Sequence, residues 1–146
     1  MRRAAIVARE INPTAVLGSV HSLQFGAVSM FLGTVRDLND GRPVSSIEYS
    51  AYVSMAEAEM DQILAESEEK FGVRAIVVEH RVGLLELGEV SIAIATAHQH
   101  RRPALDATRF VIDEIKARVP IWKLERYADG TSDWVDPTKS DEAMFP

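Results

Sequence analysis

The stretch Lys116–Arg126, KARVPIWKLER, decides how helix and strand alternate in the second half of the chain. Residues from about 102 to 118, the last three of which begin this stretch, carry apolar side chains at helical spacing and predict a long helix. Pro120 disfavours helical backbone at the preceding residue and therefore ends that helix. Residues 121–127 return as a predicted strand, so the stretch joins a helix to a strand across one proline.

The remaining sequence predicts further helices and strands around this unit. A short helix over 13–22 is expected to begin after the capping residue Asn12, and a second long helix over 54–71 is expected to end at Gly72. Strands are expected at residues 4–9, 26–36, 44–52, 73–82 and 89–98. Two main helices and a largely antiparallel or mixed sheet place the chain in the α+β class.

Three segments are expected to lie outside these elements. Residues 37–43, DLNDGRP, are dense in turn-forming residues and predict a mobile loop, and residues 84–89, LLELGE, predict a bend between two strands. Residues 128–146 contain turn formers, acids and few apolar anchors. We therefore expect a catalytic domain over residues 1–127, followed by a loosely held C-terminal tail over residues 128–146.

The composition limits the classes of function. The chain has 146 residues, enough for one domain with a substantial core, and 47% hydrophobic with 26% charged residues is typical of a soluble globular protein. A net charge of −6 argues against broad nucleic-acid binding. The absence of cysteine excludes thiolate catalysis and disulfides. We see no membrane span and no signal peptide, and we expect a cytoplasmic protein.

Two lysines flank the proline break and are candidate catalytic residues. Lys116 lies at the edge of the apolar helical stripe, and Lys123 shares a strand face with Ile121 and Glu125. Each also has a structural reading: Lys116 as a cation at a helix C-terminus, and Lys123 as an edge-strand lysine reaching water. If both ammonium groups face one pocket, they create a local anion-binding site on an otherwise acidic protein.

Arginine and histidine residues supply the other candidate anion ligands. Arg36 ends the strand over 26–36, while His100 and Arg101 lie where the last long helix begins, at a position that favours anions. At a rise of about 1.5 Å per residue, Arg101 and Lys116 are on the order of 20 Å apart along one helix. Either the chain has two sites, or a second subunit of a homodimer brings its own His100 and Arg101 to the lysines.

A metal site is the weaker interpretation of the histidines. His98 and His100 alternate as strand residues do and could direct two imidazoles to one side, but no third ligand follows at a suitable spacing. We therefore expect no metal site and no resident cofactor. Phosphate-cradling and dinucleotide-binding glycine motifs are also absent from the sequence.

Three segments give the chain a resemblance to a known family. Residues 26–52 (GAVSMFLGTVRDLNDGRPVSSIEYSAY), 79–101 (EHRVGLLELGEVSIAIATAHQHR) and 104–125 (ALDATRFVIDEIKARVPIWKLE) resemble, in this order, the large catalytic subunit of molybdopterin synthase. The likeness extends from about Ile6 to Trp134. It implies a single-domain fold of the α/β-hammerhead type that forms a homodimer.

The resemblance also implies an activity and its residues. Members of this family transfer sulfur from the C-terminal Gly-Gly thiocarboxylate of a small ubiquitin-like carrier to cyclic pyranopterin monophosphate, which forms the dithiolene of molybdopterin. Two carriers and the homodimer make a heterotetramer. Carried over onto this sequence, the family's substrate-binding positions fall on Thr34, Val35, Arg36, His100, Arg101, Lys116, Lys123, Leu124 and Glu125. Lys116 and Lys123 are the expected catalytic residues.

Two rival functions remain open from the sequence. A non-catalytic dimeric module that binds a phosphorylated metabolite or a carrier tail would need the arginines but would be indifferent to the lysines. An acyl-group transferase that uses an activated carboxylate is a second enzyme class, but the sequence offers no nucleophile for it. The paired lysines favour the sulfurtransferase.

Overall fold

The structure, a computed structural model, describes residues 1–136. Its helices span Pro13–Val20 (α1), Val53–Phe71 (α2) and Arg101–Arg118 (α3). Its strands span Arg2–Val7 (β1), Ala27–Thr34 (β2), Leu38–Asn39 (β3), Arg42–Ala51 (β4), Ala75–Arg81 (β5), Gly83–Glu86 (β6), Val90–His98 (β7), Ile121–Tyr127 (β8) and Ser132–Val135 (β9). Across these residues, no helix has the length and apolar character that crossing a membrane requires.

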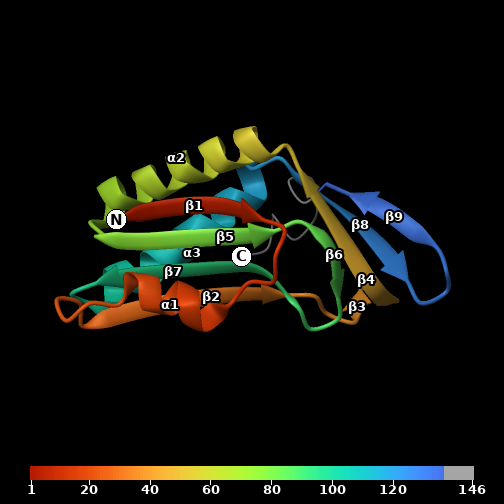
Figure 1. Cartoon of the computed structure of the whole chain (residues 1–146), viewed down its shortest axis with the longest axis horizontal. Coiled ribbons are helices and arrows are strands. Elements are labelled where there is room, and N and C mark those ends of the chain that lie inside the picture. Colours follow the sequence, from red (N-terminus) through yellow and green to blue (C-terminus); the bar gives the residue numbers. More distant parts are fainter. Residues whose placement is uncertain (137–146) are drawn as a thin grey trace.

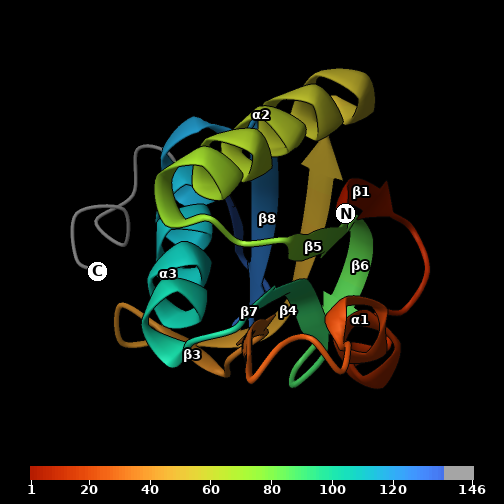
Figure 2. The same ribbon diagram turned by 90° about the vertical axis from the view of Figure 1, so that its left-hand side faces the viewer.

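The first sheet has the strand order β1-β5-β7-β2 (Figure 1). Strands β1 and β5 run parallel, and the other pairs are antiparallel. Helices α2 and α3 cover one face of this sheet and α1 covers the other, as Figure 2 shows from the end of the strands. The mixed sheet and the α+β class agree with the expectation from the sequence.

Alternation along the central strands divides the core into two layers. On β5, Ile76 and Val78 face α2 and α3, while Ala75 and Val77 face α1. Alanines at 93, 95 and 97 of β7 also lie on the α1 side. These small side chains let a short helix approach the sheet closely, whereas the larger side chains of the opposite face fill the space beneath two long helices.

A second sheet meets the first at one end of the molecule (Figure 1). Its strand order is β3-β4-β8-β9, and β6 also pairs with β4. Val35, Val44, Ile47, Leu85 and Tyr127 form its own small core. The sequence predicted the individual strands better than their division into two sheets.

Three segments differ from the expected loop, bend and tail. Residues 38–43 form most of a tight hairpin between β3 and β4, in which Asp40 and Gly41 adopt positive φ angles of 50° and 75°. Residues 84–86 of the expected bend belong to strand β6, which pairs with β4. Residues 132–135 form β9 and pair with β8, so the sheet extends beyond the expected domain end at 127. Residues 137–146 of the expected tail lie outside the described residues.

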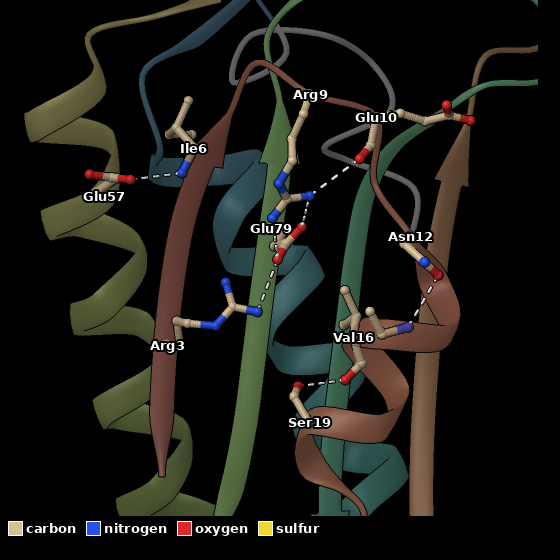
Figure 3. Close-up of polar contacts among 10 residues, drawn as sticks. Arg3, Ile6, Arg9, Glu10, Asn12, Val16, Ser19, Glu57 and Glu79 are labelled. Atoms are coloured by element: carbon tan, nitrogen blue, oxygen red, sulfur yellow. Dashed lines mark hydrogen bonds and ion pairs between the residues drawn. The ribbon is translucent and has the colours of Figure 1, made fainter.

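The α1 side of the first sheet carries a buried carboxylate. Glu79 is 3% exposed and forms ion pairs with Arg3 at 2.9 Å and Arg9 at 3.1 Å (Figure 3). Burial alone would raise the pKa of Glu79, but the hydrogen bonds and charges of the two arginines outweigh it and lower that pKa. This arginine cluster therefore stabilises a buried charge in the sheet, and it lies on the face away from α2 and α3.

The core makes a direct stability prediction. Ile94 on β7 is fully buried beneath the two long helices, so Ile94→Ala should lower the free energy of unfolding by about 2–5 kcal/mol through lost burial and an unfilled cavity. Leu23→Ala is the matched control, because Leu23 is 100% exposed, and should change stability by less than about 0.5 kcal/mol. Urea denaturation measures both; equal effects of the two truncations would contradict the described core.

Candidate functional site

A cavity of about 180 Å³ lies where the second sheet meets the first sheet and α3. Its apolar wall includes Phe31 of β2, Ile92 of β7 and Ile115 of α3. Its polar lining comes from many separate parts of the chain and comprises Thr34, Arg36, Asn39, Tyr49, His80, Ser91, Lys116, Lys123 and Glu125. Apolar walls with a few convergent polar groups are typical of small-molecule sites.

Both candidate catalytic lysines line this cavity. Lys116 reaches it from the last turn of α3, and Lys123 reaches it from β8 after the break at Pro120. On β8 the alternation is as expected: Lys123 is 8% exposed on the inner face, while Trp122 on the outer face is 40% exposed. The proline break therefore turns the chain so that a helix end and a strand deliver two lysines to one place.

Lys123 forms an ion pair with a carboxylate on its own strand. The Lys123 Nζ and the Glu125 Oε1 are 3.2 Å apart, and Glu125 is 1% exposed. Removing one partner of such a buried pair leaves an uncompensated charge, which is strongly unfavourable. The pair therefore fixes a positive charge in the wall of the cavity.

Glu125 is held ionised by several donors. Burial tends to raise its pKa, but hydrogen bonds from Asn39 and Tyr127, together with the Lys123 charge, lower it overall. The Tyr127 hydroxyl donates to Oε2 at 2.8 Å. Burial and this hydrogen bond raise the pKa of Tyr127 to about 12, so its hydroxyl remains a donor at ordinary pH.

Arg36 and Thr34 bring the end of β2 to the same cavity. Both residues are exposed, and the Arg36 Nη2 donates to the Asn39 Oδ1 at 3.3 Å. An arginine fork at the rim of a cavity with two lysines inside is suited to an anion such as a phosphate ester or a carboxylate. Geometry therefore joins Arg36 to the lysines although they are 80 or more residues apart in the sequence.

Two of the carried-over positions do not present their side chains to the cavity. Val35 is buried in the small core of the second sheet, and Leu124 points to the outer face of β8, opposite Lys123 and Glu125. Thr34, Arg36, Lys116, Lys123 and Glu125 are the carried-over positions that line it.

His100 and Arg101 lie elsewhere on the same subunit. They line a shallow depression with Arg102, Leu105 and Asp106 at the start of α3. Arg101 and Lys116 are separated along α3 by about 22 Å at the usual helical rise. As the helix length predicts, a single subunit does not bring both groups of residues around one small ligand.

The histidine pair near α3 shows no metal-binding cluster. The His98 Nδ1 accepts a hydrogen bond from the His100 backbone N–H at 2.9 Å, and the ring centroids are 5.9 Å apart. Within residues 1–136, no group of three or more potential metal-binding side chains is present. This local hydrogen bond instead shapes the backbone that leads into α3.

His80 is a polar residue of the cavity that the sequence analysis did not single out. It lies on the same face of β5 as Ile76 and Val78, packs edge-on against Tyr49 at 5.1 Å, and its Nδ1 is 2.9 Å from the Arg81 backbone oxygen. Burial chiefly lowers the pKa of His80 to about 4, and the charge of Lys116 adds to this effect. Its imidazole is therefore neutral at pH 7 and, with Nδ1–H donating to the carbonyl, exposes an acceptor nitrogen.

The depressed pKa of His80 predicts a pH-dependent loss of stability. Between pH 6.5 and about 4, the unfolded chain takes up a proton that the folded His80 refuses, so the free energy of unfolding falls as the pH falls. This residue alone should remove about 2 kcal/mol between pH 7 and pH 4.5. His80→Gln removes that component, and urea denaturation at both pH values should show a smaller fall for the variant. An equal fall in both proteins would contradict a neutral buried His80.

Comparison with known proteins adds an independent finding. The model of the family described as MoaE protein matches residues 6–118. The molybdopterin synthase catalytic subunit of Bacillus subtilis is 38% identical over 135 residues, which cover 92% of this chain and 85% of the relative. The bovine subunit is 46% identical over 109 residues, or 75% of this chain. The chain spans only 58% of the length of that bovine relative.

Solved structures agree with the sequence relatives. A molybdopterin synthase structure from Staphylococcus aureus is similar with a TM-score of 0.85 and 35% identity, and covers 90% of this chain and 95% of its own. A molybdopterin biosynthesis MoaE protein from Burkholderia ambifaria MC40-6 is similar with a TM-score of 0.83 and 31% identity, and covers 99% of this chain and 95% of its own. The two-sheet arrangement is therefore shared with these structures.

Proposed function

This chain belongs to the MoaE protein family, and on that premise we propose that it acts as the catalytic subunit of a molybdopterin synthase. In this role it transfers sulfur from the C-terminal thiocarboxylate of a small carrier protein to cyclic pyranopterin monophosphate. The observation that carries the proposal is the cavity in which Arg36, Lys116 and Lys123 converge. A cationic cavity without cysteine suits a reaction whose sulfur arrives on a partner.

The proposed reaction makes clear demands on the site. In each transfer a C–S bond forms at a side-chain carbon of the pterin while a C–O bond at that carbon breaks, and the displaced oxygen takes up a proton. The C–S bond of the carrier breaks, and water supplies the oxygen that completes the carrier's C-terminal carboxylate. Both reactants are anionic, so the charges of Lys116 and Lys123 attract them and stabilise negative charge that develops during transfer. Since Lys123 is paired with the buried Glu125, its part is electrostatic.

Lys116 is the proposed proton-transfer group. It lies in the same cavity at the end of α3, and its charge acts on the neutral imidazole of His80. An ammonium group there can donate a proton to a leaving oxygen or, once deprotonated, accept one from attacking water. Arg36 would bind the cyclic phosphate at the rim, because its fork donates two hydrogen bonds at once.

The assembly and location are also part of the proposal. The partner is a small ubiquitin-like carrier whose Gly-Gly tail enters the cavity as an extended segment, and two carriers with a homodimer of this chain form a heterotetramer. His100 and Arg101 of the neighbouring subunit would complete the anion site, because their own subunit holds them about 22 Å from Lys116. The location is cytoplasmic.

Reconstitution with purified components tests the proposed function. The chain, a thiocarboxylated carrier and cyclic pyranopterin monophosphate are mixed, and the dithiolene pterin is measured. Product should form only when all three are present, and a carrier that ends in an ordinary carboxylate is the matched control. Binding of both partners without any product would replace the synthase with the non-catalytic binding module.

A further inference from the structure

Asn39 is the residue through which the β3–β4 hairpin contacts the cavity. Its Nδ2 lies 2.9 Å from both Glu125 Oε1 and Glu125 Oε2, across 86 residues of sequence. Its Oδ1 accepts the hydrogen bond from Arg36. One amide therefore connects the arginine at the rim to the buried carboxylate that is paired with Lys123.

The orientation of this amide is determined from both sides. Arg36 can only donate hydrogen bonds, and an ionised Glu125 can only accept them. If the amide were flipped, its oxygen would face the carboxylate and its NH₂ group would face the guanidinium, and both hydrogen bonds would be lost. Only a side chain with a donor at one end and an acceptor at the other satisfies both neighbours.

Glu125 depends on this contact because it is almost fully buried. A carboxylate out of water needs donors for its oxygens, and those of Glu125 come from Asn39, Tyr127 and Lys123. Asn39 donates to both of these oxygens. It comes from the hairpin, whereas Tyr127 and Lys123 are on the same strand as Glu125.

We propose that Asn39 is a positioning residue of the sulfur-transfer site. Its amide holds Glu125, and with it the Lys123 ammonium, at a fixed position relative to the Arg36 guanidinium. The inference rests on the proposed function for its kinetic consequences, while its structural basis does not depend on them. It gives the β3–β4 hairpin a role that its turn-rich sequence does not reveal. The hairpin carries no reacting group and acts through what Asn39 holds in place.

The variants Asn39→Asp and Asn39→Ala distinguish the contribution of the amide NH₂ group from that of the amide oxygen. Aspartate still accepts from Arg36 but places a second carboxylate against Glu125, so turnover should fall by about tenfold to a hundredfold with the KM for the pterin little changed. Alanine removes both contacts, so turnover should fall similarly and KM should rise as well. Wild-type kinetics in both variants would overturn the proposal.

Asn39→Asp also has a distinctive pH dependence. Two carboxyl groups this close cannot both ionise easily, so one of them has a raised pKa and takes up a proton as the pH falls. The protonated group can then donate as the amide does. Other charged or titratable groups surround Glu125: Lys123 and Tyr127 on β8, and Arg36, Lys116 and His80 in the lining of the cavity. These groups are the same in the variant and the wild type, so they do not change the ratio of the two turnovers.

The expected result is that the ratio of variant to wild-type turnover rises between pH 8 and pH 6. A ratio that stays flat, with both proteins folded, would contradict the proposed contact. Asp40→Asn is the matched control, because Asp40 is exposed at the tip of the same hairpin, and its turnover should match the wild type at every pH.

A stability measurement tests the proposed role of Asn39 independently of the proposed function. The unfolding free energy of Asn39→Asp, relative to the wild type, should recover from pH 8 to pH 5, since the folded variant binds the extra proton. This readout needs no activity, so it tests the contact even if the wild type makes no product and the proposed function fails. If Asn39→Ala does not fold, Asn39→Ser replaces it, with the same kinetic expectation. No recovery at low pH would overturn the contact.

Discussion

Lys116→Ala is expected to lower the turnover of sulfur transfer by about 10²–10⁴-fold, the usual contribution of a positioned proton-transfer group. The side chain is half-buried at the end of α3 and lines the cavity beside His80, so its loss removes a charge from the proposed site of transfer. The fold should be unaffected, because the helix keeps its apolar contacts through Val111 and Ile115. Single-turnover measurement of dithiolene formation, with thermal unfolding in parallel, checks both expectations.

Lys116→Arg shows which property of the lysine matters. Arginine keeps the positive charge but does not release its proton at ordinary pH, so it serves for attraction and not for proton transfer. Turnover as low as in Lys116→Ala would assign proton transfer to Lys116, whereas near wild-type turnover would leave it an electrostatic role alone. Lys70→Ala is the control, because Lys70 is an exposed lysine at the end of α2 that does not line the cavity.

Sequence periodicity predicted most helices and strands because their signals are local. The apolar spacing before Pro120 predicted α3, and Gly72 at a φ of 70° ends α2 as expected from its freedom to adopt left-handed backbone. Strand β6 was not predicted, because the segment LLELGE is short and contains glycine and glutamate, which are uncommon in strands. Its pairing with β4 depends on a partner more than 30 residues away, which no local pattern encodes.

The candidate site was predicted only in part, because only some of its residues are linked by local sequence patterns. Lys116 and Lys123 could be paired from sequence because a single proline separates their elements. Alternation on the strand also placed Glu125 beside Lys123. Asn39 and His80 could not be found this way, since their neighbours come from distant strands. The available signal for His80 was its place on the strand face of Ile76 and Val78, where a polar side chain follows two apolar ones.

The two polar clusters of the fold both hold a buried charge, but they differ in what surrounds it. Glu79 and Glu125 are both almost fully buried and ionised, and both receive hydrogen bonds from several side chains. The arginines around Glu79 approach from the surface on the α1 side, so that cluster serves stability. Around Glu125, the donors line or adjoin a cavity, so the same electrostatic arrangement holds a positive charge in the wall of that cavity.

Two variants that are inactive alone are expected to regain activity when their subunits are combined. If each site uses Lys116 of one subunit and Arg101 of the other, a mixed dimer of Lys116→Ala and Arg101→Ala contains one site with both mutations and one site with neither. Random pairing makes half of the dimers mixed, so a one-to-one mixture should reach about a quarter of wild-type activity. Co-expression with two affinity tags, followed by the dithiolene assay, measures this.

The matched control combines Lys116→Ala with Lys123→Ala. These two lysines line the cavity of one subunit, so every site in a mixed dimer lacks one of them and activity should stay at the parental level. Recovery in the first combination and not in the second would require a site shared between subunits. No recovery in either combination would mean that His100 and Arg101 serve a second site on their own subunit, about 22 Å along α3 from the lysines.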